Sequence, residues 1–469
     1  MTSDQPNPRL PLTQKLSYGL PAFALAVVGI PVYVHIPKFY TDVVGVDIAW
    51  VGSILMLARL FDAVSDPLMG VISDRARSRM GRRRPFIFWG SFCLAASMFL
   101  LFVPPHLEGI SALAWFAATI VALFFFWTVV TVPYEALGPA LTSDYTERTS
   151  LFVIRDGLLI AGTLLAAASP AIIEALQADA AVEVAQRQKF LWIALMYAPM
   201  LIGSCLWCVW RIREPVDAAQ RALPELNRLK GVLRNRPFLI LLTSYTIGAL
   251  GSNLPATLIL YYVQYVLEST RADLFLFLYF ASGILVLPIW IKLSRRVGKK
   301  NAWLASMAIN TMAFIGVYFL GPGDEWGYAV LVVLSGLGFG ATLALPSAIQ
   351  ADVIDYDEYL TGSRQEGWYI GIWSVVKKFS AAIGVGAGLT ILGMVGYTPV
   401  ENQPPEVIQA LKVLYAIVPS VCNAVAFAIA LAFPISQQAH QRILESIALM
   451  KQGQPVADPL QRQPGVQSP

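Results

Sequence analysis

The 469-residue sequence contains few charged residues, because Asp, Glu, Lys and Arg together make up 14% of it. Soluble domains usually carry about 25%. Hydrophobic residues make up 56%, and the mean hydropathy is +0.60. A water-soluble fold has no use for so much apolar side chain, so the composition excludes an ordinary soluble protein and indicates one embedded in a membrane.

Histidine and cysteine are also scarce, with three and four residues respectively. His35, His106 and His440 lie far apart in the sequence, which argues against a membrane enzyme that works through a histidine-rich or metal-binding motif. Cys205 and Cys208 form a CxxC pair, but the pair lies inside an apolar stretch, where a redox motif is not expected. The sequence therefore predicts that the protein is not an enzyme and uses no cofactor.

Apolar stretches follow one another along most of the chain. Crossing about 30 Å of hydrocarbon takes roughly 20 apolar residues in a helix. About twelve stretches meet this requirement, at 17–41, 47–73, 86–105, 111–138, 151–176, 190–211, 237–263, 272–291, 302–320, 326–350, 367–395 and 408–433. The predicted fold is an all-α membrane protein with about twelve transmembrane helices.

The loops between these stretches differ in charge. Lys and Arg cluster after the second stretch in 75–84, after the eighth in 292–300, and in the long segment 212–236. Basic loops face the cytoplasm, so both termini are predicted to be cytoplasmic and the protein to lie in the plasma (bacterial inner) membrane. Because the net charge of +4 is distributed over short loops, it does not indicate a nucleic-acid partner.

The central basic segment divides the stretches into six and six. The sequence DRARSRMGRRR after the second stretch has a faint counterpart, KLSRRVGKK, after the eighth. Two related halves around a central cavity are typical of the major facilitator fold, although generic basic loops would look similar. The predicted parts are an N-terminal half 1–213, a cytoplasmic loop 214–236, a C-terminal half 237–434 and a cytoplasmic, largely disordered tail 435–469.

Two carboxylates interrupt the second apolar stretch. Asp62 and Asp66 are four residues apart and so lie on one face of a helix. A carboxylate inside hydrocarbon costs about 2.5 to 3.5 kcal/mol on insertion scales, so two together are predicted to bind a cation. This cation is either Na⁺, held by hard oxygen ligands, or a proton shared between like charges. Alternatively, Asp66 marks a helix end near water while Arg59 pairs with Asp62.

Two lysines, Lys377 and Lys378, lie inside the eleventh stretch. Consecutive side chains on a helix point about 100° apart, so one lysine is expected to face a cavity while the other snorkels or meets a neighbouring helix. If Lys377 faces the two aspartates, it can occupy the cation site when the ion is absent. Such a pairing would couple ion binding to helix movement, and Lys378 is a candidate for the substrate side.

Polar residues also follow one face of the fourth stretch and begin the fifth. Thr128, Thr131 and Glu135 are spaced by three and four residues. Threonine in a membrane helix can simply bond its own backbone. Arg155 precedes Asp156, and the two can form either part of a cavity or an ordinary pair near the membrane surface. We take Thr131, Glu135 and Arg155 as candidate substrate-binding residues.

Four segments match one known family: Tyr18-Gly19; Phe39-Tyr40-Thr41-Asp42; Ala58-Arg59-x-x-Asp62-x-x-x-Asp66-Pro67-Leu68-Met69-Gly70; and Ala351-Asp352-x-x-Asp355-Tyr356-x-Glu358-Tyr359 with Gly362, Arg364, Glu366 and Gly367. In these segments, which span both halves, the chain resembles the glycoside-pentoside-hexuronide:cation symporters of the major facilitator superfamily. This family includes the melibiose permease.

The resemblance implies roles for particular residues. Asp62, Asp66 and Thr128 correspond to the cation site, a metal site if the ion is Na⁺, and Lys377 to its positively charged neighbour. Arg155 resembles the arginine of the family's sugar site, in an alignment uncertain by one residue. Tyr18 and Trp373 complete the candidate substrate contacts.

Two positions depart from the melibiose permease. Leu25-Ala26 stands where that protein has an acidic residue for sugar hydroxyls, and Thr131 replaces its fourth-helix aspartate. Because Leu and Ala offer no side-chain acceptor, galactoside recognition of that kind is not expected. An amphipathic substrate, as in related sodium-dependent lysolipid carriers, or an anionic one bound by Arg155 and Lys378, remains an alternative.

The predicted function is a cation-coupled symporter, driven by Na⁺ or H⁺, which moves a glycoside or related sugar by alternating access. The alternatives are a sodium-dependent carrier of an amphipathic or lysolipid-type substrate and, less favoured, a membrane enzyme or a channel. The expected partners are a small-molecule substrate, the coupling cation and membrane lipid. The protein is expected to act as a monomer.

Overall fold

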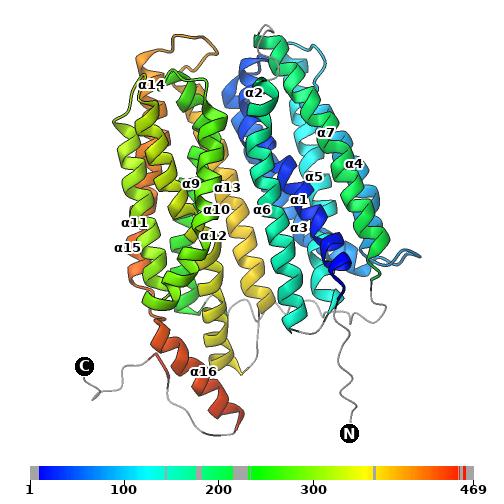
Figure 1. Cartoon of the computed structure of the whole chain (residues 1–469), viewed down its shortest axis with the longest axis vertical. Coiled ribbons are helices and arrows are strands. Elements are labelled where there is room, and N and C mark those ends of the chain that lie inside the picture. Colours follow the sequence, from blue (N-terminus) through cyan, green and yellow to red (C-terminus); the bar gives the residue numbers. More distant parts are fainter. Residues whose placement is uncertain are drawn as a thin grey trace. The chain divides into compact units, whose positions relative to one another are not determined.

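The computed structural model describes residues 10–142, 145–175, 182–214, 231–232, 234–362, 366–452, 454 and 458–460. Every regular element in these ranges is a helix (Figure 1). The elements are α1 Leu12–Ile30, η1 Pro31–His35, α2 Ile36–Asp42, α3 Ile48–Arg75, α4 Arg84–Phe102, α5 Gly109–Leu141, α6 Tyr145–Ala175, α7 Val182–Arg211, α9 Arg236–Tyr265, α10 Ala272–Val297, α11 Lys299–Tyr318, α12 Glu325–Thr361, α13 Glu366–Met394, α14 Pro405–Lys412, η2 Val413–Ile417, α15 Val418–Leu431 and α16 Gln437–Lys451.

Eleven helical segments in the described part of the chain are long and apolar enough to cross a membrane. Two of them, Leu12–Asp42 and Pro405–Leu431, are continuous runs of several elements. The remaining predicted stretch, 302–320, is α11, a helix of 20 residues. It is less apolar than the others because Asn301 and Asn310 lie within it. The prediction of an all-α membrane fold is confirmed.

The contacts within the chain divide it into two compact units. Unit 1 comprises Met1–Arg221, Ala256–Phe280 and Val385–Leu411; unit 2 comprises Ala222–Pro255, Ala281–Gly384 and Lys412–Pro469. Unit 1 therefore contains α1 to α7 together with the end of α9, the start of α10, the end of α13 and most of α14. This grouping cuts across four helices that follow the central loop in sequence, namely α9, α10, α13 and, at its last residue, α14.

The first apolar stretch predicts one regular helix, but the first membrane-spanning segment of the structure is interrupted. A π-helical turn, Pro31–His35, separates α1 from α2. Proline in a helix interior removes a backbone hydrogen bond and crowds the preceding turn. Pro31 is the first residue of this π-helical turn, and Pro37 lies two residues after its end. Wide turns of this type occur mainly at functional sites, and this one adjoins the pocket described below.

The basic loop after α3 is tightly folded. The side chain of Glu214 accepts hydrogen bonds from the backbone nitrogens of Arg82 at 2.7 Å and Arg83 at 3.0 Å, and Arg83 also pairs with Asp74 at 2.7 Å. Gly81 has a φ of +106°, and a Cβ atom there would lie 2.6 Å from the Glu214 carboxylate. Only glycine fits this position. The basic loop is therefore held by specific hydrogen bonds to Glu214, which follows α7.

Part of the segment expected to be a largely disordered tail is helical. In α16, Ile443 is fully buried and Ala439 nearly so, and both belong to the hydrophobic core of unit 2. The Ser436 side chain caps the helix by accepting from the backbone nitrogen of Ala439. His440 lies 3.0 Å from Asp355 of α12. The prediction was wrong for α16 because its apolar face is short and interrupted by polar residues; most residues after it lie outside the described ranges.

Replacing Ile443 by Ala should release α16 from unit 2. Truncating a buried isoleucine costs about 2–5 kcal/mol, enough to favour local detachment of a helix held by one apolar face. We expect faster amide hydrogen exchange across 437–451 and little change in the membrane helices. Leu444, 47% exposed on the same helix, is the matched control. Equal protection in the two variants would contradict the assigned docking face.

Candidate functional site

The two aspartates of α3 meet a threonine of α5 inside unit 1. The hydroxyl oxygen of Thr128 lies 2.6 Å from Oδ1 of Asp62 and 3.0 Å from Oδ1 of Asp66. Asp62 is 2% exposed and Thr128 is 1% exposed. Ser65 is close by, with its hydroxyl 3.4 Å from that of Thr128. The spacing of four on α3 thus brings three oxygen atoms from two helices together.

The chemistry of this cluster favours a cation. A hydroxyl carries a single proton, so Thr128 donates at full strength to one carboxylate at a time. The second short oxygen–oxygen contact is favourable when a proton or a metal cation neutralises part of the charge. Carboxylate and hydroxyl oxygens are hard ligands, and their burial makes a residual negative charge expensive. The cluster can therefore hold either a proton or a small hard cation.

A pocket of about 320 Å³ opens beside this cluster, between α1, α5 and α6. Its apolar wall comes mainly from α1 and contains Leu25, Ala26 and Ile30. Its polar residues come from α5 and α6. The remaining lining residues are Ala22, Gly29, Tyr33, Trp127, Thr131, Tyr134, Glu135, Arg155, Leu159 and Thr163. Ligand pockets commonly combine an apolar lining with a few polar groups, and this one has both.

Two glycines allow α1 and α6 to approach closely enough to shape this pocket. A Cβ atom at Gly162 would lie 2.3 Å from the backbone oxygen of Phe23, and one at Gly19 would lie 2.6 Å from the Leu158 side chain. Small residues at helix crossings permit such close contact in membrane proteins. The backbone of Arg155 lies 3.3 Å from the same Gly19 position, so the crossing also places this arginine at the pocket.

Arg155 is the cation of the pocket. Its guanidinium binds its neighbour Asp156 through Nη2 at 2.7 Å and Nε at 2.8 Å, and it stacks over Phe152 with Cζ 4.6 Å from the ring centroid. The Asp156 side chain is about half exposed, so this pair is screened by water and weak. The aromatic contact orients the guanidinium at the pocket.

The other predicted residues of α1 and α5 have distinct positions. Thr131 and Glu135 line the pocket, but the Thr131 hydroxyl donates to its own helix at the Trp127 carbonyl, 2.9 Å away. Tyr18 does not line the pocket. It is fully buried behind Tyr134, with ring centroids 5.0 Å apart, and Tyr134 donates to the Tyr18 backbone oxygen. Tyr18 thus supports the pocket wall from behind.

Three predicted residues belong to unit 2. Lys377 of α13 is exposed and Lys378 is partly exposed. Trp373, one turn earlier, is 8% exposed and packs in the hydrophobic core of unit 2, where its ring centroid lies 4.2 Å from that of Tyr245. The burial of Trp373 against Tyr245 gives it a structural contact within this unit.

The contact of Arg59 with two aromatic rings was not predicted from the sequence. The guanidinium of Arg59 lies 3.8 Å from the ring centroid of Tyr33 and 4.9 Å from that of Phe124. Arg59 lies almost one turn before Asp62 on α3, and Tyr33 lines the pocket. Cation–π contacts are worth about 2 kcal/mol when desolvated. The sequence signal was Arg59 itself, a charge inside an apolar stretch.

Comparisons with known proteins identify the family to which the chain belongs. Residues 17–437 match the family described as MFS/sugar transport protein. The glucuronide carrier protein homolog of Escherichia coli is 29% identical over 87% of this chain and 90% of its own length. The isoprimeverose transporter of Lactiplantibacillus pentosus is 26% identical over 88% of this chain and 86% of its own length.

A solved structure supports the fold. A bacterial homologue of the human drug peptide transporters matches with a TM-score of 0.66 and 13% identity, over 93% of this chain and 98% of its own. The predictions of a symporter-type transporter and of a protein that is not an enzyme are confirmed by the family and its members. The chain is a multi-pass membrane transporter of the major facilitator superfamily, and it belongs to the MFS/sugar transport protein family.

Proposed function

We propose that this protein couples the downhill movement of Na⁺ or H⁺ to the uptake of a sugar that carries an anionic group, such as a glucuronide. The observation that supports this most directly is the short contact of the Thr128 hydroxyl with both Asp62 and Asp66. Such a cluster is stable in a membrane when a cation occupies it. The protein then lies in the bacterial inner membrane as a monomer with cytoplasmic termini, in keeping with its basic loops.

The coupling follows from the position of the cluster. Cation binding removes the repulsion between the two carboxylates of α3 and fixes α5, whose next turn lines the pocket. Lys377 of α13 is the proposed coupling residue, in keeping with the family resemblance. Ion and substrate together then favour the change between inward-facing and outward-facing states.

The substrate class follows from the pocket. Arginine pairs with carboxylates through two parallel hydrogen bonds, and Arg155 lines the pocket next to Asp156, a half-exposed and therefore weak partner. Trp127 and Tyr33 add aromatic faces to the lining, which suit the apolar faces of a sugar ring. The glucuronide carrier homolog among the relatives carries a substrate of this chemistry by its name.

Replacing Arg155 by Gln should reduce uptake of glucuronides far more than uptake of neutral glycosides. A hydrogen bond to a charged group contributes about 1.5–3 kcal/mol, which corresponds to a loss of about 10-fold to 100-fold in apparent affinity. The measurement is KM for a radiolabelled glucuronide and a neutral pentoside in membrane vesicles. Arg211→Gln is the control, since that guanidinium stacks on exposed Trp207 and Trp210. An equal loss for both substrates would contradict the assignment.

The function as a whole is tested by uptake into vesicles with Na⁺ and proton gradients imposed separately. A panel of glucuronides, neutral glycosides and lysolipids should show accumulation of one sugar class with one ion. The apolar wall formed by Leu25, Ala26 and Ile30 makes an amphipathic substrate the second candidate. Accumulation of lysolipid alone would favour that candidate, and downhill equilibration without any response to either gradient would refute coupling.

A further inference from the structure

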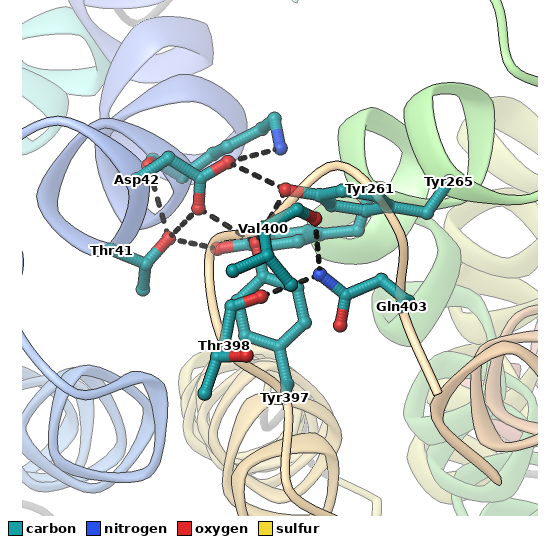
Figure 2. A network of polar contacts seen from close by, with 9 residues as sticks. Thr41, Asp42, Tyr261, Tyr265, Tyr397, Thr398, Val400 and Gln403 are labelled. Carbon is teal, nitrogen blue, oxygen red and sulfur yellow. Dashed lines mark hydrogen bonds and ion pairs between the residues drawn. The ribbon is translucent and has the colours of Figure 1, made fainter. Parts of the chain in front are cut away.

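A buried polar cluster closes one end of unit 1, at the junction where α2 ends (Figure 2). The Asp42 carboxylate lies 2.6 Å from Nζ of Lys38 and accepts hydrogen bonds from the hydroxyls of Tyr397 at 2.7 Å and Tyr265 at 3.3 Å. The Thr41 hydroxyl lies 2.7 Å from Asp42. We call these residues, with Tyr261, the Asp42 cluster.

The cluster is largely shielded from water, although the side chains of Lys38 and Asp42 are each 16% exposed. Tyr261 is fully buried, Tyr397 is 5% exposed and Thr41 is 2% exposed. The Lys38 ammonium lies 4.6 Å and 4.7 Å from the ring centroids of Tyr261 and Tyr265, so it is held by aromatic faces as well as by Asp42. Burial raises the pKa of the Tyr397 phenol well above its ordinary value, so this hydroxyl keeps its proton and donates to Asp42.

The cluster joins three parts of the chain that are far apart in sequence. Asp42 ends the first membrane-spanning segment, Tyr261 and Tyr265 are at the end of α9, and Tyr397 follows α13. Beside it, the last turns of α13 pack directly on α3. A Cβ atom at Gly386 would lie 2.4 Å from the Met56 side chain, and one at Gly52 would lie 2.7 Å from that of Leu389.

These contacts explain why unit 1 includes the ends of helices that follow the central loop. Residues from Ala256 and from Val385 group with the first seven helices and not with the remainder of their own helices. His35, in the π-helical turn, adds a contact of 3.5 Å to Asp273 at the start of α10. For a path between the two sequence halves to open at this end, the helix ends must separate from α2 and α3, and the Asp42 cluster must break.

We infer that Asp42 is a positioning residue of the transport cycle, which holds the path closed at this end so that the pocket communicates with the opposite side. The inference rests on the proposed alternating-access function. The Asp42 carboxylate interacts with residues of α2, α9 and the segment after α13. Its negative charge therefore determines how strongly these three segments are held together. The basic loops lie at the opposite ends of the helices, so this end faces the outside in the proposed orientation.

The test measures from which side the pocket can be reached. A single reporter cysteine replaces Thr163, which lines the pocket, in a variant whose four native cysteines are changed to serine or alanine. A membrane-impermeant maleimide is applied to right-side-out and to inverted vesicles. We expect Asp42→Asn to raise the labelling rate from the outside by about tenfold, in line with the loss of charge-assisted hydrogen bonds, and to lower the rate from the inside.

The control is Asp47→Asn, which removes a carboxylate from the same region. Asp47 caps α3 by accepting hydrogen bonds from the backbone nitrogens of Ala49 and Trp50. It should leave both labelling rates unchanged. Tyr397→Phe removes one donor and should shift the rates in the same direction by a smaller factor, which keeps the test valid if Asp42→Asn does not fold.

Unchanged rates in Asp42→Asn and in Tyr397→Phe would overturn the inference, and so would a parallel rise from both sides, which indicates general loosening. Labelling needs neither ion nor substrate. If coupled uptake is not observed but Asp42→Asn still shifts the labelling rates, only the proposed coupling is refuted. If coupled uptake is observed but Asp42→Asn leaves the labelling rates unchanged, the role of Asp42 is refuted.

Discussion

An Asp62→Asn variant is expected to lose ion-driven accumulation of substrate, with initial uptake lowered about 100-fold or more. Asparagine keeps the size of the side chain but removes the charge, and replaces one acceptor oxygen by a donor that repels a cation. Charged hydrogen bonds and ion contacts at a buried site are worth several kcal/mol, and each 1.4 kcal/mol is tenfold. The measurement is gradient-driven uptake in vesicles, together with counterflow at equal ion concentrations.

Two substitutions of Thr128 separate the effect of its hydroxyl from the effect of its shape. Thr128→Ser keeps the hydroxyl that lies 2.6 Å from Asp62, so we expect it to retain most of the uptake, whereas Thr128→Val keeps the shape and loses the hydroxyl and should lower ion affinity about tenfold. The Asp47→Asn variant serves again as the carboxylate control. An Asp62→Asn protein that still concentrates its substrate against a gradient would rule out this cation site.

Gly162→Ala is expected to have the largest effect on stability. The added Cβ atom would lie 2.3 Å from the Phe23 backbone oxygen and 3.1 Å from the Ala26 side chain, and a backbone oxygen cannot move aside as a flexible side chain can. Overpacking costs about 1–3 kcal/mol, and here it must separate α1 from α6 or distort both. We expect a lower melting temperature in detergent and a poorly formed pocket, measured by thermal unfolding and by substrate binding.

Gly157→Ala on the same helix is the control for this prediction. No atom lies within 4 Å of a Cβ added at Gly157, and alanine favours the helical state by up to about 1 kcal/mol over glycine. This variant should be unchanged or slightly more stable. If the two substitutions had equal effects on the melting temperature, close contact at the crossing of α1 and α6 would not determine the stability of unit 1.

Much of the fold could be predicted from the sequence because the bilayer imposes a direct length requirement on each helix. Most helix bounds follow the apolar stretches closely, and even α11 was found despite Asn301 and Asn310. The largest differences are at α7, which begins at Val182 and not at 190, and at α12, which ends at Thr361 and not at 350. The group formed by Asp62, Asp66 and Thr128 was also predictable in part. Asp62 and Asp66 share a face by their spacing alone, whereas the approach of Thr128 depended on resemblance to a family, since no local pattern reports which helices become neighbours.

Other features depend on contacts between distant segments and could not be predicted. Asp42 and Tyr397 are far apart in sequence, and Asp42 stood out only as the end of the segment Phe39-Tyr40-Thr41-Asp42. Tyr33 looked like one more aromatic residue of an apolar helix until its ring was found against Arg59. The tail helix α16 was missed because its stability comes from docking of Ile443 and not from its own propensity.

Trp127 and Thr128 are consecutive residues of α5, yet one lines the pocket and the other touches the carboxylates. About 100° of rotation around one helix therefore separates the proposed substrate pocket from the proposed ion site. Binding linkage is reciprocal: if the cation raises the affinity for the sugar by some factor, the sugar must raise the affinity for the cation by the same factor. Titrating either ligand in the presence of the other therefore measures a single coupling free energy.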